Sequence, residues 1–175
     1  MTSELIGGTF GTASSNLSPS YIVATKFTAT VTGTITEMRC NCATAGHIQL
    51  AVYSDNSNYP GSLLASATST AVTNGTNTIT FPNLVVIAGT AYWLAANTDT
   101  NHLLADATAG SLLYSALTYG TAFPSTFPGG ASSLNSNVDL QGWGVTPAGL
   151  QGTAAPTVKS GLTAPTVKSG LTSPA

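Results

Sequence analysis

The chain has 175 residues, and only 6% of them are Asp, Glu, Lys or Arg, against about 25% in an average soluble domain. No stretch of the sequence approaches the ~18 to 20 apolar residues that span a bilayer, so we expect no membrane insertion. All six acidic residues lie in the first 150 positions, beside only Lys26 and Arg39. Such a balance offers no basic stripe for phosphates, which excludes nucleic acid as an expected partner.

The polar residues are mainly Thr, Ser, Asn and Gly instead of charged side chains. This composition is typical of extracellular β-proteins and virion components more than of cytosolic enzymes. The opening MTSELIGGTFG has neither the basic nor the apolar region of a signal peptide. Either the sequence begins at a mature terminus with an added Met, or the protein is made and assembled inside a cell. The second case is the expectation for a phage structural protein, which is released by lysis and not by secretion.

Short runs rich in Thr, Val, Ile, Tyr and Phe are separated by Gly, Asn and Pro, and helix signals are almost absent. In the run from His47, Ile48, Leu50 and Val52 alternate with Gln49, Ala51 and Tyr53, so we expect the first three to face a core and the others to face outward. The same rule places Tyr92, Leu94 and Ala96 on one face and Trp93 on the other. We expect seven to nine strands, with the clearest in the runs 21–31, 32–42, 47–55, 61–70, 76–83, 89–99 and 138–145.

These connections are too short for helical crossovers, so the strands must be antiparallel. The pair Asn74-Gly75 predicts a turn before the run 76–83. We therefore expect an all-β fold over residues 1–150, an antiparallel two-sheet β-sandwich of jelly-roll-like type. Residues 99–130 fit this pattern least. Their aromatic residues either fill the end of the core from a long loop or form an exposed surface for sugars or subunits: Tyr114, Tyr119, Phe123 and Phe127.

The tail, residues 151–175, contains the nonapeptide APTVKSGLT twice in succession, at 155–163 and 164–172. Proline every nine residues forbids a helix and favours an extended conformation. Identical apolar residues at fixed spacing predict an arm that docks into equivalent grooves; the alternative is a recent duplication within a disordered tail. The predicted assembly residues are Pro156, Val158, Lys159, Leu162, Pro165, Val167, Lys168 and Leu171.

Sites for chemistry are sparse. We predict no catalytic residues and no cofactor, because no Ser elbow, phosphate loop or His-rich metal spacing occurs. His102 and Asp106 could approach each other, although a solvated loop pair is the commoner arrangement. The oxygen-rich turn SDNSNYPG offers a weak calcium candidate at Asp55, Asn56 and Asn58, but it departs from the EF-hand pattern, and a turn held by Asx hydrogen bonds is the alternative.

Cys40 and Cys42 share one face of an expected strand, either as buried free thiols or as partners in bonds between subunits. Core packing is the default for Trp93 and Trp143. The alternative is a glycan-stacking platform that uses one exposed tryptophan near a tyrosine, with Tyr59, Trp93 and Trp143 as the candidates.

The stretch from Leu50 to Asp99 also carries an ordered set of motifs. They are Val52-Tyr53-Ser54-Asp55, Pro60-Gly61, Leu63-Leu64-Ala65, Phe81-Pro82 and Gly89-Thr90-Ala91-Tyr92-Trp93-Leu94. In this order they resemble a jelly-roll β-sandwich module of bacterial surface-anchored and carbohydrate-binding-like proteins and of phage structural proteins of the decoration or fibre type. The resemblance implies a jelly roll, but such modules serve as sugar binders, spacers and virion decorations alike.

Three functions compete at this point. A non-enzymatic structural protein on a virion surface accounts for the low charge, the polar composition and the repeated tail together; its partners would be copies of itself and other structural proteins. A carbohydrate-binding or adhesion module of an extracellular or cell-surface protein, with glycans as partners, accounts for the fold and the aromatic residues. An enzyme accounts for no specific feature, because the groups for acid–base work are too few.

Overall fold

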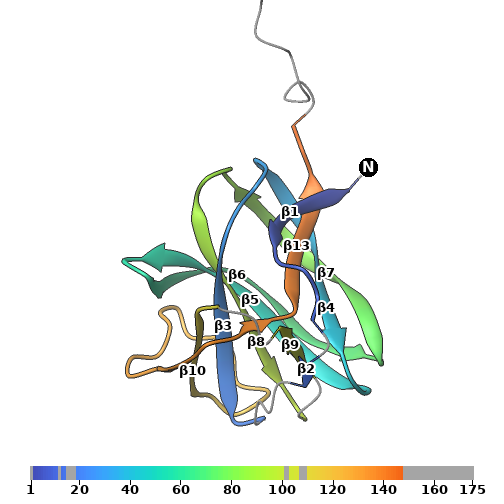
Figure 1. Cartoon of the computed structure of the whole chain (residues 1–175), viewed down its shortest axis with the longest axis vertical. Helices are drawn as coiled ribbons and strands as arrows, with labels where there is room; N and C mark the ends of the chain where they lie inside the picture. The colour runs from blue at the N-terminus through green and yellow to red at the C-terminus, as the bar shows by residue number, and fades with distance from the viewer. Residues whose placement is uncertain (1, 12, 15–18, 101–102, 107–109, 148–175) are drawn as a thin grey trace, which may run out of the picture.

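The computed structural model describes residues 2–11, 13–14, 19–100, 103–106 and 110–147 (Figure 1). These ranges contain thirteen β-strands and no helix. Every strand pair is antiparallel, which confirms the predicted all-β antiparallel class. All seven predicted runs contain a strand. The prediction of seven to nine strands is too low, because six short strands of two to five residues lack the alternation that makes a strand visible in sequence.

The strands form two large sheets and one small sheet. The four-stranded sheet has the order β1 (Ser3–Gly7), β13 (Leu140–Val145), β4 (Gly33–Cys42) and β7 (Gly75–Val86). The six-stranded sheet has the order β11 (Ser132–Leu134), β10 (Leu112–Ala116), β3 (Tyr21–Thr28), β8 (Ala91–Thr98), β5 (Gly46–Asn56) and β6 (Tyr59–Val72). The small sheet has the order β12 (Asn137–Val138), β9 (Leu104–Asp106) and β2 (Ala13–Ser14).

The main core lies between the two large sheets. Ile48, Leu50 and Val52 on β5 are fully buried there, as the alternation predicts, and they belong to one cluster with Ile35 and Leu140 of the opposite sheet. Tyr92, Leu94 and Ala96 of β8 belong to the same cluster. Burial of apolar surface supplies most of the free energy that favours folding, so the inward faces of β5 and β8 define how the sheets pack.

A second core covers the outer face of the six-stranded sheet, so this face carries the predicted residues but does not meet solvent. Gln49, Ala51 and Tyr53 were expected to face outward, yet they are only 8%, 0% and 0% exposed. Phe123 and Phe127, from the segment between β10 and β11, lie over them. These two phenylalanines therefore neither fill the end of the main core nor form an exposed surface; they close a separate core.

The predicted turns are found where the sequence places them. The chain reverses between β6 and β7 at Thr73 and Asn74, and Gly75 adopts φ +94°. Between β5 and β6 it reverses at Ser57 and Asn58, whose φ angles of 54° and 67° are both positive. A two-residue hairpin of type I′ requires positive φ at both central positions, which Asn and Asp tolerate best.

Candidate functional site

The arm predicted at the C-terminus lies outside the described residues, as does the domain boundary after residue 150. The arm positions concerned are Pro156, Val158, Lys159, Leu162, Pro165, Val167, Lys168 and Leu171. The last described residue is Pro147, two positions after the end of β13. In Figure 1, β13 ends at the same end of the sandwich at which β1 begins, in agreement with the pairing of Ser3 with Gly144.

An apolar patch marks this end of the four-stranded sheet. Val145, the last residue of β13, is 44% exposed, and Val85 on β7 is 63% exposed. Both pair with Thr34 of β4, so the three side chains share the outer face of the sheet. Ile87, which follows β7, is 56% exposed. Exposed aliphatic side chains that lie side by side are typical of a contact surface, and here they lie at the end of the sheet where β13 ends.

The calcium candidate is occupied by a lysine ammonium group. The Lys26 Nζ lies 3.3 Å from the Asp55 Oδ1 and also donates a short hydrogen bond to the Asn58 Oδ1. The backbone N–H of Asn58 points to the Asp55 Oδ2 over 3.5 Å, as in the Asx-type turn that was the alternative. Within the described residues, no group of three or more His, Cys, Asp and Glu side chains could hold a metal ion. The oxygens of this turn therefore bind a cation that the chain itself provides.

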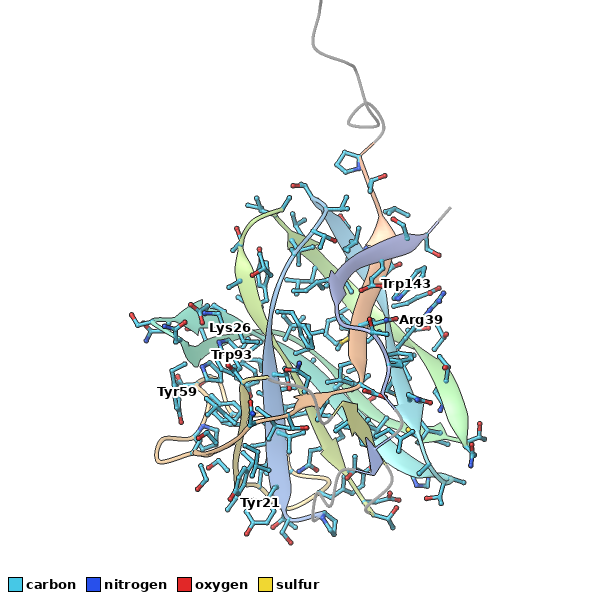
Figure 2. All side chains as sticks on the ribbon, in the orientation of Figure 1. Tyr21, Lys26, Arg39, Tyr59, Trp93 and Trp143 are labelled. Atoms are coloured by element: carbon cyan, nitrogen blue, oxygen red, sulfur yellow. The ribbon has the colours of Figure 1, made fainter. Side chains whose placement is uncertain are left out.

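Trp93 connects this turn to the second core. Its indole Nε1–H donates a 2.8 Å hydrogen bond to the Asp55 Oδ1, and the side chain is only 1% exposed. Trp93 therefore offers no ring face to a sugar, which corrects its prediction as a stacking residue. Tyr59, the candidate that lies near Trp93 (Figure 2), is partly buried. Its hydroxyl donates to the Pro128 carbonyl oxygen at 2.6 Å, and its ring meets Phe127 edge-on.

We expect Asp55 to contribute to stability in a pH-dependent way. Burial alone would raise the pKa of Asp55, but the hydrogen bonds from Trp93 and Lys26 outweigh burial and hold this pKa below its ordinary value. The stabilisation is therefore complete above the unfolded pKa of about 3.9 and is lost as pH falls through the folded pKa. In urea titrations at pH 7 and pH 3, Asp55→Asn should show a smaller drop in unfolding free energy than the unsubstituted protein.

Glu4→Gln is the matched control for this experiment, because it should change the drop in unfolding free energy between pH 7 and pH 3 in the opposite direction. Burial raises the pKa of Glu4, and the nearby Arg39 only partly offsets it. Glu4 therefore favours folding below its unfolded pKa, and this contribution is lost as pH rises through the folded pKa. Glu4→Gln should enlarge the drop in unfolding free energy between pH 7 and pH 3. Equal drops in unfolding free energy for Asp55→Asn and for the unsubstituted protein would contradict a lowered pKa of Asp55 in the folded state.

Trp143 lies on the other side of the molecule, on the outer face of the four-stranded sheet (Figure 2). The Arg39 guanidinium carbon is 3.6 Å from the centre of the Trp143 ring, and the indole N–H donates to the Gln141 Oε1 at 2.9 Å. Glu37 and Glu4 pair with Trp143 from the two flanking strands. One face of this partly buried ring is thus used by a cation–π contact. Sequence reasoning missed Arg39, whose proximity depends on the pairing of β4 with β13.

Cys40 and Cys42 lie on the inner face of β4, with 0% and 1% exposure. They are free thiols whose sulfur atoms are 3.9 Å apart. The hydrogen bond with Cys42 and burial raise the pKa of Cys40. These positions correspond to the alternative of buried thiols. A bond between subunits would require sulfur atoms at the surface, and neither sulfur is there.

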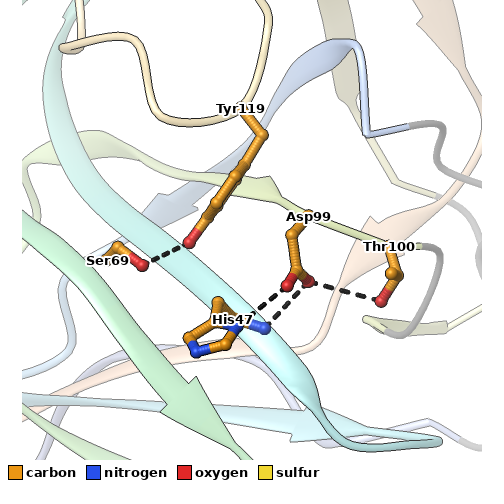
Figure 3. Close-up of polar contacts among 5 residues, drawn as sticks. All are labelled: His47, Ser69, Asp99, Thr100 and Tyr119. Atoms are coloured by element: carbon orange, nitrogen blue, oxygen red, sulfur yellow. Dashed lines mark hydrogen bonds and ion pairs between the residues drawn. The ribbon is translucent and has the colours of Figure 1, made fainter.

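A histidine–carboxylate pair is present, but not the predicted one. His102 lies outside the described residues, as does the side chain of Asp106. Instead, His47 Nδ1 is 2.9 Å from the Asp99 Oδ2, and the His47 backbone N–H donates to the other carboxylate oxygen at 2.8 Å (Figure 3). Ser69 lies nearby, and its hydroxyl is hydrogen-bonded to Tyr119.

A serine nucleophile needs a histidine within hydrogen-bond distance to take its proton. Among the described residues no hydrogen bond joins Ser69 to His47, so the two pairs stay separate. The His47–Asp99 contact instead ties the start of β5 to the residue after β8. The backbone N–H of Asp99 completes it by donating to the His47 carbonyl oxygen at 3.1 Å.

The arrangement defines the class of protein as an antiparallel β-sandwich with a second core on one outer face. Comparisons with protein-family models, with curated proteins and with solved structures found no match for the chain. The described residues contain no helix that is long and apolar enough to cross a membrane.

Proposed function

We propose that the protein is a non-enzymatic structural component of a virion surface, of the capsid decoration or fibre type. Its β-sandwich is the body, and residues 151–175 are an extended arm that docks on neighbouring subunits. The observation that carries this proposal is the duplication of APTVKSGLT, without any change, directly behind a sandwich. A flexible spacer would not need to keep Val and Leu in register through two repeats. The exposed Val85, Ile87 and Val145 at the end where the arm begins support a contact surface there.

We also propose that the sandwich has jelly-roll topology. Without β2 and the short strands β9 to β12, eight strands remain, which can be counted in chain order as β1, β3, β4, β5, β6, β7, β8 and β13. In that count the sheets have the orders first-eighth-third-sixth and second-seventh-fourth-fifth. This is the order that two Greek keys produce when they wrap into a jelly roll. The order supports the resemblance seen between Leu50 and Asp99, a stretch that spans β5 to β8.

A carbohydrate-binding or adhesion module at a cell surface is the weaker proposal. A stacking platform needs an accessible ring face. Trp93 is buried, Tyr59 packs on Phe127, and Arg39 covers one face of Trp143. Tyr59 and Trp143 both keep some exposure, and Trp143 is the one whose ring packs on no other aromatic side chain among the described residues, so it is the residue to test first. Glycan-array binding that is lost in Trp143→Ala but kept in Trp93→Phe would favour the carbohydrate function.

Loss of the arm should abolish association without unfolding the body. We expect a chain truncated after Leu150 to keep the melting profile of the full chain but to sediment as a monomer at concentrations where the full chain associates. A full-length variant serves as control for chain length. It carries an aspartate in place of each of Val158, Leu162, Val167 and Leu171 and should behave as the truncated chain does, because charged side chains are costly to bury in apolar grooves. Unchanged sedimentation of both variants would contradict the arm's role.

A further inference from the structure

β6 is an edge strand whose second edge is open in its middle part. It pairs with β5 on one side and is the last strand of the six-stranded sheet. At its start the second edge is covered: the Leu63 N–H donates to the Ser125 carbonyl oxygen at 2.8 Å, and Phe127 N–H donates to the Gly61 carbonyl oxygen at 3.2 Å. Towards its end, Tyr119 hydrogen-bonds the Ser69 hydroxyl. Between these contacts, within the described part of the chain, no strand pairs with that edge.

This open stretch lacks the usual protection of an edge strand. Proteins commonly block exposed edges with charged side chains, proline or bulges. No charged residue occurs anywhere from Asn56 to Thr98. β7, the edge of the opposite sheet, contains Pro82 within a break in its pairing with β4, whereas β6 has a proline only at Pro60. Bulges do interrupt β6, but Ala65–Ala67 pair in regular register with β5 between them.

Two grooves flank the open stretch, and Ser66, Ala67 and Thr68 line both of them. The first, about 350 Å³, lies towards the opposite sheet, where Phe81 and Pro82 of β7 form its far wall. The second, about 260 Å³, lies towards the segment that covers the outer face, and its other lining residues are Gln49, Gly120, Ala122 and Phe123. Successive side chains of a strand point to opposite faces. A strand added to this edge would therefore place alternate side chains in the two grooves.

We propose that the open edge of β6 at Ala65–Thr68 is the acceptor for one arm repeat of a second copy of this chain, added as an extra β-strand. The inference rests on the proposed function. In Pro156-Thr157-Val158-Lys159, Val158 would enter the groove beside Phe81, and Thr157 and Lys159 would point to the opposite side. Backbone hydrogen bonds would provide the affinity, and the alternate side chains would provide the specificity.

The number of repeats indicates why a second copy is needed. Each chain carries two full repeats but one open β6 edge, so an arm that uses both repeats must reach another molecule. Two linked repeats also raise the strength of attachment beyond that of either repeat alone. The arm carries Lys159 and Lys168, and the acceptor strand β6 contains no cationic side chain that would repel them.

Disulfide trapping between separately purified full-length copies tests the acceptor site. One copy carries Thr68→Cys and the other Val158→Cys; Thr68 is exposed and lines both grooves. Under mild oxidation we expect the mixed dimer, seen on a non-reducing gel, to form at least about tenfold faster than with a Thr44→Cys copy. Thr44 is exposed in the turn between β4 and β5 and lines neither groove. Equal rates for Thr68→Cys and Thr44→Cys would overturn the proposal.

Sedimentation of a second pair of variants separates this inference from the proposed function. Thr68→Arg should weaken self-association about tenfold, because a long cationic side chain blocks the edge and repels the arm lysines, while Thr68→Ser should not. If the aspartate-substituted arm prevents association but Thr68→Arg does not, the arm docks elsewhere and the β6 acceptor is wrong. If neither variant changes association, the arm's role fails as well.

Discussion

Replacing Trp93 by alanine is expected to lower the free energy of unfolding by about 3 to 5 kcal/mol, the usual range for removing a large buried aromatic side chain. The indole is 1% exposed and packs in the second core with Tyr53, Phe123 and Phe127. Its removal leaves a cavity at the centre of that core and also removes the hydrogen bond to Asp55. Urea unfolding followed by far-ultraviolet circular dichroism measures the loss directly.

Trp93→Phe separates the contribution of the Trp93 hydrogen bond to stability from that of its packing, and Trp143→Ala is the control. Trp93→Phe keeps most of the ring but removes the N–H donor, so it should cost about 1.5 to 3 kcal/mol from the lost bond to a carboxylate, plus the reduced packing. Trp143→Ala is the matched control, since Trp143 is a partly exposed strand tryptophan in contact with Arg39. A Trp93→Ala loss no larger than that of Trp143→Ala would contradict the second core as a major source of stability.

Gly144→Ala is expected to be the most disruptive single-methyl substitution in the four-stranded sheet. A Cβ at Gly144 would lie 1.8 Å from the Thr34 carbonyl oxygen and 2.7 Å from its carbonyl carbon. Both atoms belong to the backbone of β4, so no side-chain rotation relieves the overlap, and β13 must move away from β4. Overpacking commonly costs about 1 to 3 kcal/mol, and because the overlap is with backbone we expect about 3 kcal/mol or more.

The control for this substitution is Gly129→Ala. A Cβ at Gly129 would have no atom within 4 Å, so the change in unfolding free energy should stay within about 0.5 kcal/mol. Urea titrations of both variants provide the comparison. A loss in Gly144→Ala as small as that in Gly129→Ala would mean that β13 and β4 are not held as closely as the structure places them.

The strands themselves were predictable because their signals are local. Alternation along β5 separates Ile48, Leu50 and Val52 from their neighbours, and the main core forms from that set. The turn at Asn74-Gly75 was visible because positive φ strongly favours glycine. The short strands had too few residues for a pattern. β12, for instance, consists of Asn137–Val138 alone and exists only because β9 lies beside it.

What covers each face was decided by contacts between residues far apart in the chain. Alternation says that the two faces of β5 differ, but it does not say whether the second face meets solvent or another part of the protein. Phe127 closes the face that carries Tyr53, more than seventy positions away in sequence, with ring centres 5.5 Å apart. The same contacts bury Trp93, whereas Trp143 keeps partial exposure. Local residue order can specify a strand and its two faces, but only the packed chain brings distant segments together and determines which side chains remain available to a partner.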